Sequence, residues 1–227
     1  MSKVLLYSGG LDSFALRHLW KPDVSLYVNL GTDYSLVEMA KLDRDVPIVD
    51  FPGLLTFERP DKIIPLRNLF LIGIAAQFGN EIALAATAGD RVLDKSFRFA
   101  SQAGAILTLL MNDYWSDQRG DYEVVLPVKD LTKRQLVAEY LRAGGDPHEL
   151  AEGSFSCYTP TAELQACGRC KPCFRKWVAF KLNGFEIEPD SKPYIEAEIL
   201  PQIIAGHYGR ADEEAEILEA IGYVHPH

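Results

Sequence analysis

The chain of 227 residues is short of basic residues, with 23 Lys and Arg against 32 Asp and Glu and a formal net charge of −9. Proteins that bind nucleic acid in general neutralise its phosphates with Lys and Arg. The acidic balance therefore argues against a nucleic-acid partner and favours a small substrate. A local basic patch stays open around Lys129, Lys133, Arg134 and the segment 169–176.

Long apolar runs are also missing. No run reaches the roughly 18 apolar residues of a membrane-spanning helix. Asp12 interrupts the hydrophobic start of the chain, and no small-residue cleavage site follows. We therefore expect no membrane association and a cytoplasmic location. The apolar content of 48% is ample for a folded core, so wholesale disorder is excluded.

Short apolar segments typical of strands alternate with helical segments over the first 150 residues. Strands that alternate with helices form parallel sheets joined by right-handed crossovers, so the sequence predicts a doubly wound α/β fold with a five-stranded parallel sheet. The expected strands are 4–7, 24–28, 46–51, 82–86 and 123–126. The expected helices are 11–20, 37–42, 69–78, 97–111, one that starts near residue 132, and an acidic one at 212–221. Because 69–78 is almost continuously apolar, we expect that helix to be buried on most sides.

The first expected strand runs directly into Ser8–Ser13, with the sequence SGGLDS. Gly9 and Gly10 have no Cβ and tolerate positive φ, so a phosphate can approach the free N–H groups of the helix that starts at Leu11. The hydroxyls of Ser8 and Ser13 add donors. The carboxylate of Asp12 is of the kind that positions Mg²⁺. The segment matches neither GxxxxGK[ST] nor GxGxxG, and an ordinary glycine turn is the alternative to a phosphate site.

Two further helix starts carry candidate binding residues. Arg67 and Asn68 precede the apolar helix, where a planar guanidinium can clamp a phosphate or a carboxylate. An ion pair or a helix cap is an equal alternative there. Thr132 is a plausible N-cap, and Lys133 beside it offers an ammonium group to a phosphate. A plain capped helix is the alternative at this second position.

The four cysteines lie close together, at Cys157, Cys167, Cys170 and Cys173, with the spacing C-x9-C-x2-C-x2-C. Zinc takes four thiolates at tetrahedral corners with bonds of about 2.3 Å, and a C-x2-C turn brings two sulfurs within that range. We therefore expect a structural Zn²⁺ site without an open coordination position. An iron–sulfur cluster is the main alternative, since its bacterial runs share the C-x2-C-x2-C spacing.

Taken together, these motifs resemble the PP-loop ATP pyrophosphatases and, within them, the QueC family. The resemblance spans about 3–180. It rests on Ser8–Ser13, Asp33-Tyr34 with Glu38, Pro65–Asn68, Pro127, Leu131–Lys133, Ser156–Tyr158 and Cys167–Cys173. It implies an adenine nucleotide α-hydrolase-like (HUP) fold with a small four-cysteine zinc lobe.

The QueC family converts 7-carboxy-7-deazaguanine, ammonia and ATP into the nitrile 7-cyano-7-deazaguanine (preQ0) for queuosine or deazapurine biosynthesis. The resemblance therefore implies an ATP-dependent ligase that releases AMP and pyrophosphate, with ATP, Mg²⁺ and Zn²⁺ as cofactors and a deazapurine and ammonia as partners. The implied nucleotide-binding residues are Ser8, Gly9, Gly10, Leu11, Asp12, Ser13, Arg67 and Asn68. The implied catalytic residues are Asp12, Ser13, Lys133 and Arg67. We also expect a homodimer.

Two departures from the family pattern leave the substrate open. The loop Thr87–Ser96 lacks the family's Tyr-Pro and Cys, and Arg175-Lys176 stands where the family has a Leu-Arg pair. A QueC-like ligase that adenylates another carboxylate or amide, such as one on a protein terminus, is the main alternative. The acidic charge argues against a tRNA-thiolating PP-loop enzyme. The intact phosphate motif argues against a catalytically silent nucleotide-binding module.

Three parts are expected along the chain. Residues 1–150 form the α/β nucleotide-binding domain, and 151–183 form the zinc-binding lobe. From Gly184 the character changes, with Pro189, Pro193 and Pro201 before the acidic helix. We therefore expect a C-terminal helical extension over 184–227, largely beyond what the family normally carries.

Overall fold

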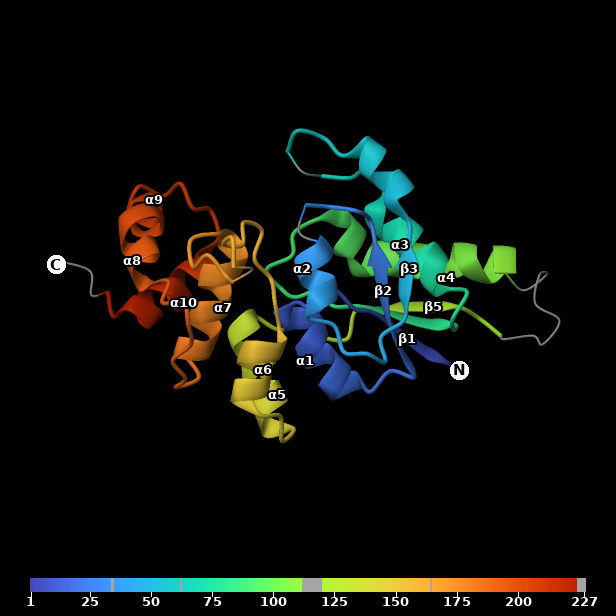
Figure 1. The fold of residues 1–227 in the computed structure, drawn as a ribbon, viewed down its shortest axis with the longest axis horizontal. Coiled ribbons are helices and arrows are strands. Elements are labelled where there is room, and N and C mark those ends of the chain that lie inside the picture. Colours follow the sequence, from blue (N-terminus) through green and yellow to red (C-terminus); the bar gives the residue numbers. More distant parts are fainter. Residues whose placement is uncertain (34, 62, 112–119, 164, 224–227) are drawn as a thin grey trace.

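The sheet is the centre of the fold in the computed structural model, which describes residues 1–33, 35–61, 63–111, 120–163 and 165–223. Its order is β3-β2-β1-β4-β5 and every pairing is parallel. The strands are β1 (Lys3–Leu6), β2 (Val24–Asn29), β3 (Ile48–Asp50), β4 (Glu81–Leu84) and β5 (Glu123–Val125) (Figure 1). The predicted doubly wound, five-stranded parallel α/β fold is thus confirmed.

Helices cover both faces of this sheet, because successive strand residues point to opposite sides. Leu5 of β1 and Ala83 of β4 share one core with the helices α1 (Leu11–Trp20), α5 (Lys133–Arg142) and α6 (Pro147–Gly153). Their neighbours Val4 and Ile82 share a second core with α3 (Arg67–Ala75) and α4 (Phe97–Met111). The short helix α2 (Ser35–Ala40) and the 3-10 turns η1 (Pro52–Phe57) and η2 (Leu93–Lys95) lie in the connections.

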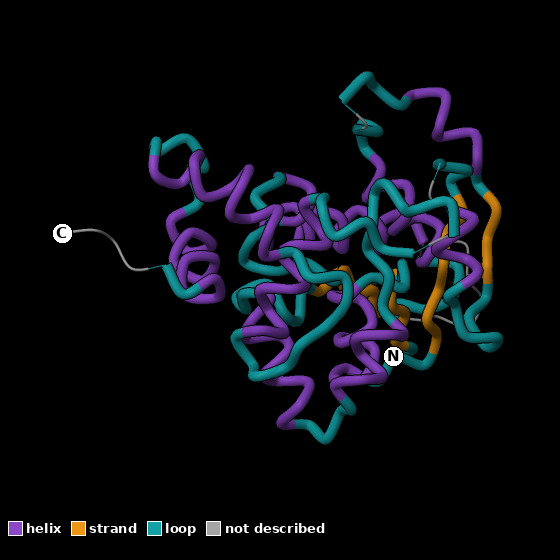
Figure 2. The backbone as a smooth tube through the Cα atoms, turned by 60° about the vertical axis from the view of Figure 1, so that its left-hand side comes forward, coloured by secondary structure: helices purple, strands orange, loops and turns teal. Residues whose placement is uncertain are grey.

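Helix α7 (Lys171–Lys181) joins the C-terminal part of the chain to the sheet domain. Its Phe180 is fully buried in the core that contains β1, whereas Trp177 packs against the last helices. Those last elements are α8 (Lys192–Tyr194), the π-helical turn η3 (Ile195–Ile199), α9 (Leu200–Ile204) and α10 (Ala211–Ile221). They gather at the end of the molecule away from the sheet (Figure 2). The acidic helix expected at 212–221 is confirmed as α10.

Two details of the sequence prediction are corrected. Helix α3 is not buried on most sides, because Leu69 and Phe70 are 38% and 43% exposed, while only Ile72 and its neighbours face the sheet. A helix with a nearly continuous apolar sequence can therefore leave one side exposed to solvent. The sequence prediction also missed α6, whose one buried residue is Leu150, and α7, although its buried residues Phe174, Trp177 and Val178 have helical spacing. Tyr34, part of the expected motif after β2, lies outside the described residues.

The topology places a ligand site at one edge of the sheet. The strand order reverses between β1 and β4, and ligands of doubly wound folds lie at such a switch point, beyond the carboxyl ends of the strands. The loops that follow β1 and β4 both start there. None of the helices in the described part of the chain is long and apolar enough to cross a membrane.

Candidate functional site

A cavity of about 450 Å³ opens at the carboxyl ends of β1, β2 and β4. Among its described lining residues seven are Lys or Arg and three are Asp or Glu. This balance is the reverse of the whole chain, which carries a net charge of −9. A cationic cavity in an acidic protein concentrates and holds anionic ligands.

The phosphate loop, Ser8–Ser13, forms one end of the cavity. Gly9 has φ +67°, a left-handed conformation that favours glycine. The buried Ser13 hydroxyl donates to the Gly10 carbonyl at 3.1 Å and accepts from the Ser8 N–H at 3.3 Å. Ser13 therefore fixes the shape of the loop, and the first turn of α1 projects from it toward the cavity.

An ion pair spans the loop and α5. The Lys133 ammonium donates to Asp12 Oδ2 at 2.6 Å and also contacts Oδ1. Lys133 is placed by the predicted cap: the Gln135 N–H donates to Thr132 Oγ1 at 3.2 Å, and the Thr132 N–H donates to Gln135 Oε1 at 2.8 Å. A carboxylate and an ammonium group thus face each other where the amino ends of two helices meet.

Arg67 enters the cavity from the start of α3. The preceding Leu66 has φ +60°, a strained conformation for a branched residue and a feature that clusters at functional sites. No residue in the described part of the chain forms a hydrogen bond or ion pair with the Arg67 guanidinium, so it is available to a ligand. Asn68 also lines the cavity, but its amide donates to Asp94 Oδ2 at 2.8 Å and ties α3 to η2.

Two carboxyl groups in the cavity have displaced pKa values. Burial raises the pKa of Glu38 to about 7, against the hydrogen bond from the Tyr27 hydroxyl at 2.8 Å and the charge of Arg67. Burial acts in the same direction on Asp90, but there the Lys95 ammonium at 3.1 Å prevails and the pKa is lowered. Asp90 is therefore a fixed negative charge among the cations, whereas Glu38 titrates near neutrality.

The loop after β4, Ala85–Ser96, is held in shape from within. The Thr87 N–H donates to Asp90 Oδ2 at 3.0 Å, and the Lys129 ammonium donates to the Thr87 and Asp90 carbonyls at 3.0 and 2.5 Å. Lys129 thus serves the loop rather than a nucleic-acid patch. The loop presents Asp90, Arg91 and Lys95 to the cavity.

The four cysteines meet the geometric test for a zinc site. Their sulfur atoms all lie within 4.8 Å of one another, and none is in a disulfide. Zinc bonds of about 2.3 Å at tetrahedral angles place sulfurs about 3.8 Å apart. The Cys167–Cys173 and Cys157–Cys170 separations are 4.0 and 3.9 Å. A hydrogen bond from Cys173 lowers the pKa of Cys170 to about 5, whereas that same hydrogen bond raises the pKa of Cys173 and burial raises that of Cys157. The Arg169 N–H donates to the Cys167 sulfur.

The cysteine lobe also forms a wall of the cavity. The Phe155 N–H donates to the Gly9 carbonyl at 2.8 Å, and the Leu11 N–H donates to Ser156 Oγ at 3.1 Å. Behind them the Lys176 ammonium donates to the Ala151 and Ser154 carbonyls at 2.7 Å, and burial lowers its pKa to about 8. The lobe therefore braces the phosphate loop directly.

The structure brings the residues expected from the sequence to one place. Ser8, Gly10, Leu11, Asp12, Ser13, Arg67, Asn68 and Lys133 line the cavity, whereas Gly9 is not among its lining residues. Ser156, Lys171, Arg175 and Arg210 line the cavity as well, but the sequence analysis gave none of them a role in binding or catalysis. The basic segment 169–176 and the departure at Arg175 were the available signals, but nothing in the sequence pointed to Arg210.

Comparison with known proteins agrees with this arrangement. The model of a family described as "Queuosine biosynthesis protein QueC" matches residues 28–184, more than half of the chain. The 7-cyano-7-deazaguanine synthase of Paracoccus denitrificans is 29% identical over 243 residues, covering 90% of this chain and 98% of that protein. The synthases of Marinobacter nauticus and Brucella ovis are 25% and 27% identical and cover 81% and 82% of this chain, and 94% and 91% of their own lengths.

The limits of these matches bear on two parts of the chain. The family match starts after the phosphate loop, so that loop is an independent indication of the same chemistry. The match ends at residue 184, where the C-terminal segment begins. Because the Paracoccus protein matches 90% of this chain, its similarity must include part of 184–227. On the extent of the family match, this chain belongs to the QueC family of queuosine biosynthesis proteins.

Proposed function

We propose that this protein is an ATP-dependent nitrile synthase that converts 7-carboxy-7-deazaguanine and ammonia into 7-cyano-7-deazaguanine, in queuosine or deazapurine biosynthesis. Its relatives bear the name 7-cyano-7-deazaguanine synthase. The observation that carries the proposal is a cationic cavity that joins a phosphate loop to a four-cysteine lobe. Both the nucleotide and the carboxylate substrate are anions, as that cavity requires.

The first activation uses the phosphate end of the cavity. ATP lies with its β- and γ-phosphates on the loop Ser8–Ser13, where the N–H groups of α1 and the Lys133 ammonium neutralise them. Mg²⁺, when bound, neutralises the pyrophosphate leaving group, and Asp12 is the residue that would hold it. Arg67 is free to neutralise the α-phosphate or the substrate, and Ser13 keeps the loop in shape. The substrate carboxylate attacks the α-phosphorus, and pyrophosphate leaves with the bonding electrons.

The second half of the reaction repeats this step on the amide. Ammonia displaces AMP from the acyl-adenylate, so AMP leaves with one of the carboxylate oxygens, and the amide and a proton result. The amide oxygen then attacks a second ATP and expels pyrophosphate. Loss of AMP and a proton leaves the nitrile. Holding the acid beside the α-phosphate supplies the proximity that both steps need.

The three parts expected along the chain have distinct roles in this proposal. Residues 1–150 bind ATP, and 151–183 use structural Zn²⁺ to hold Ser156 and Phe155 against the phosphate loop. The C-terminal segment contributes Arg210 to the substrate end. Because Ile106, Leu109 and Leu110 of α4 are 50%, 74% and 54% exposed, we also propose a homodimer that covers this face. Its use of ATP and a free deazapurine fits a cytoplasmic enzyme.

The proposal is tested by the nucleotide product. Purified protein with ATP, Mg²⁺ and ammonium should form AMP only when 7-carboxy-7-deazaguanine is added, and Asp12→Ala should abolish that AMP. Absence of AMP with this acid, alongside AMP formation with another carboxylate or amide, would replace the synthase by a related ligase. AMP without any nitrile would mean that the second activation is missing.

A further inference from the structure

The C-terminal segment contributes a side chain to the cavity. Arg210, just before α10, donates to the Gly89 carbonyl at 2.8 Å and lines the cavity beside the loop after β4. These two residues are 121 positions apart in the chain. Arg91 of the same loop donates in return to the Gly209 carbonyl at 3.2 Å. The loop and the segment thus form one wall.

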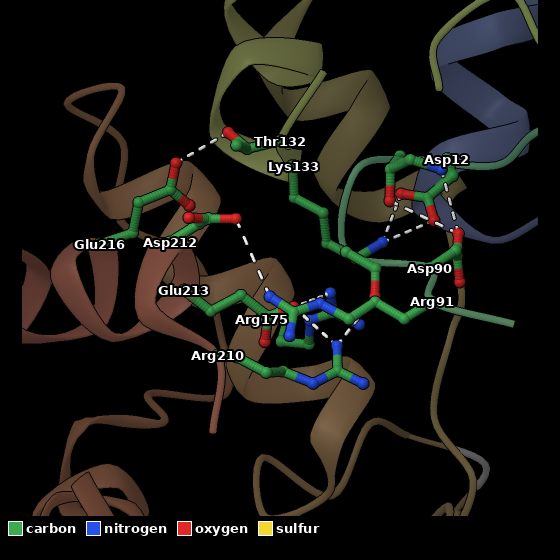
Figure 3. Close-up of polar contacts among 12 residues, drawn as sticks. Asp12, Asp90, Arg91, Thr132, Lys133, Arg175, Arg210, Asp212, Glu213 and Glu216 are labelled. Carbon is green, nitrogen blue, oxygen red and sulfur yellow. Dashed lines mark hydrogen bonds and ion pairs between the residues drawn. The ribbon is translucent and has the colours of Figure 1, made fainter. Parts of the chain in front are cut away.

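One glutamate holds two arginines in that wall. Glu213 of α10 pairs with Arg175 of α7, accepts from Arg210 at 2.9 Å and accepts from the Tyr208 hydroxyl at 2.9 Å. The side chains of Arg175 and Glu213 are only 16% and 15% exposed. Figure 3 shows the arginine groups lying between the acidic side chains of α10 and the Asp12–Lys133 pair. Two guanidinium groups share one carboxylate, so the wall keeps an excess positive charge.

Lys171 adds to this excess. It stands at the first turn of α7 and lines the same cavity as Arg175 and Arg210. Its ammonium makes no hydrogen bond or ion pair with any residue that the structure describes. Glu213 faces these three cations, and Asp90, the other carboxylate whose charge acts on Lys171, is paired with Lys95, so the wall leaves a place that a ligand anion stabilises.

Arg175 and Glu213 pack closely against Gly89 in this wall. A Cβ on Gly89 would lie 2.0 Å from Arg175 Nη2 and 2.7 Å from Glu213 Oε1. Real Cβ atoms essentially never approach this closely, so a Cβ on Gly89 would displace the ends of the Arg175 and Glu213 side chains. Glu213 holds the guanidinium groups of both Arg175 and Arg210, and the Gly89 carbonyl also holds that of Arg210, which favours the recognition of a planar anion.

We propose that Lys171, Arg175 and Arg210 form an acid subsite, separate from the phosphate loop, which binds the carboxylate of 7-carboxy-7-deazaguanine before adenylation. This inference rests on the proposed function and names the residues that select the acid. The phosphate loop and Lys133 already supply the donors for the triphosphate, so these cations serve the other anion. The amide intermediate has no charge and gains nothing from the subsite.

Equilibrium binding separates the two ligands. The dissociation constants of 7-carboxy-7-deazaguanine and of the neutral 7-amido-7-deazaguanine are measured by calorimetry in the presence of α,β-methylene ATP, for the wild type, Arg210→Gln and Lys171→Gln. Each substitution should weaken the acid about 10-fold, as expected for one charge-assisted hydrogen bond, and change the amide less than about 2-fold. Lys171→Gln removes no contact within the protein and so keeps the test valid if Arg210→Gln misfolds.

Arg134→Gln is the matched control. Arg134 pairs with Glu219 of α10 at 2.8 Å and anchors the same helix, but it does not line the cavity. It should leave both constants unchanged. The acid subsite would be overturned if either substitution weakened the acid and the amide equally, or weakened only the ATP analogue. It would also be overturned if Arg134→Gln weakened the acid, or if the wild type did not bind the acid. AMP formation, measured separately, decides the proposed function.

Discussion

The two ends of the cavity differ in how the chain builds them. At the phosphate end, the loop Ser8–Ser13 is one continuous segment whose shape is set by hydrogen bonds of Ser13 with Ser8 and Gly10, and the lobe and α5 contact it from outside. At the acid end, α7, the loop after β4 and the start of α10 meet, and Gly89 contacts residues from both other elements. The shape of the phosphate loop is therefore determined locally, whereas the acid site exists only through tertiary contacts. A protein built this way can change its acid substrate while its ATP chemistry stays constant.

The largest effect is expected from the phosphate end. Lys133→Ala removes the ammonium that faces Asp12 and, in our proposal, the pyrophosphate. The rate of AMP formation should fall by about 1000-fold, as when one group that stabilises developing charge is removed. Arg134→Ala, on the next residue of the same helix, should retain most of the rate. Similar losses in both variants would mean that the start of α5, rather than the ammonium, is needed.

Loss of zinc should affect both ends at once. Cys170→Ser should remove the metal, and the lobe should no longer hold Phe155 and Ser156 against the phosphate loop. We expect a lower midpoint of thermal unfolding and weaker binding of both ATP and the acid, about 10-fold or more. Metal analysis, calorimetry and the thermal scan measure this on one sample. If metal-free Cys170→Ser bound ATP and the acid with full affinity, the lobe would not be needed to form the site.

A methyl group on Gly89 should affect only the acid end of the cavity. Gly89→Ala displaces the ends of the Arg175 and Glu213 side chains, so KM for the acid should rise about 10-fold, whereas the free energy of unfolding should change little because flexible side-chain ends can yield. KM for ATP should stay within about 2-fold. Gly73→Ala is the control, because a Cβ there meets nothing within 4 Å and replaces a helical glycine. It should stabilise the protein by about 0.5–1 kcal/mol. Equal changes in both KM values for Gly89→Ala would contradict the division.

The smallest effect concerns Glu38, whose pKa burial raises from 4.5 to about 7. The folded state holds this proton more tightly than the unfolded state, so the stabilisation is complete below pH 4.5 and lost as the pH rises to about 7. Glu38→Gln removes that loss. Relative to the wild type, the free energy of unfolding of Glu38→Gln should rise by up to about 3 kcal/mol between pH 4.5 and pH 8, as measured by urea unfolding. The exposed Glu152→Gln is the control, and a pH-independent difference for Glu38→Gln would show that the carboxyl does not titrate in this range.

Local signals explain what the sequence could predict. Helix α1 begins and ends at the predicted residues, because the glycine turn and Pro22 bound it. Thr132 caps α5 as expected, since the capping box needs only residues three apart. The cysteine spacing likewise gave a cluster with the separations of a zinc site, because C-x2-C turns fix sulfur positions within a few residues.

The remaining features depend on contacts that no local pattern contains. Arg210 reaches the cavity only because α10 packs on α7 through Trp177 and Ile217. The exposure of Leu69 and Phe70 on α3 depends on what lies outside the helix, which its composition does not record. Burial raises the pKa of Glu38 to about 7, and the burial of a side chain follows from the whole fold. The phosphate site could thus be predicted from the sequence, whereas the residues proposed to bind the acid could not.

The central claim, that one cavity activates first an acid and then its amide by adenylation, is tested most directly by following oxygen. 7-Carboxy-7-deazaguanine labelled with ¹⁸O at both carboxylate oxygens is converted with ATP and ammonia, and the AMP is analysed by mass spectrometry. The account predicts two molecules of AMP per nitrile, each with one ¹⁸O, and unlabelled pyrophosphate. Nitrile formation with unlabelled AMP, or with the label in pyrophosphate or phosphate, would contradict it.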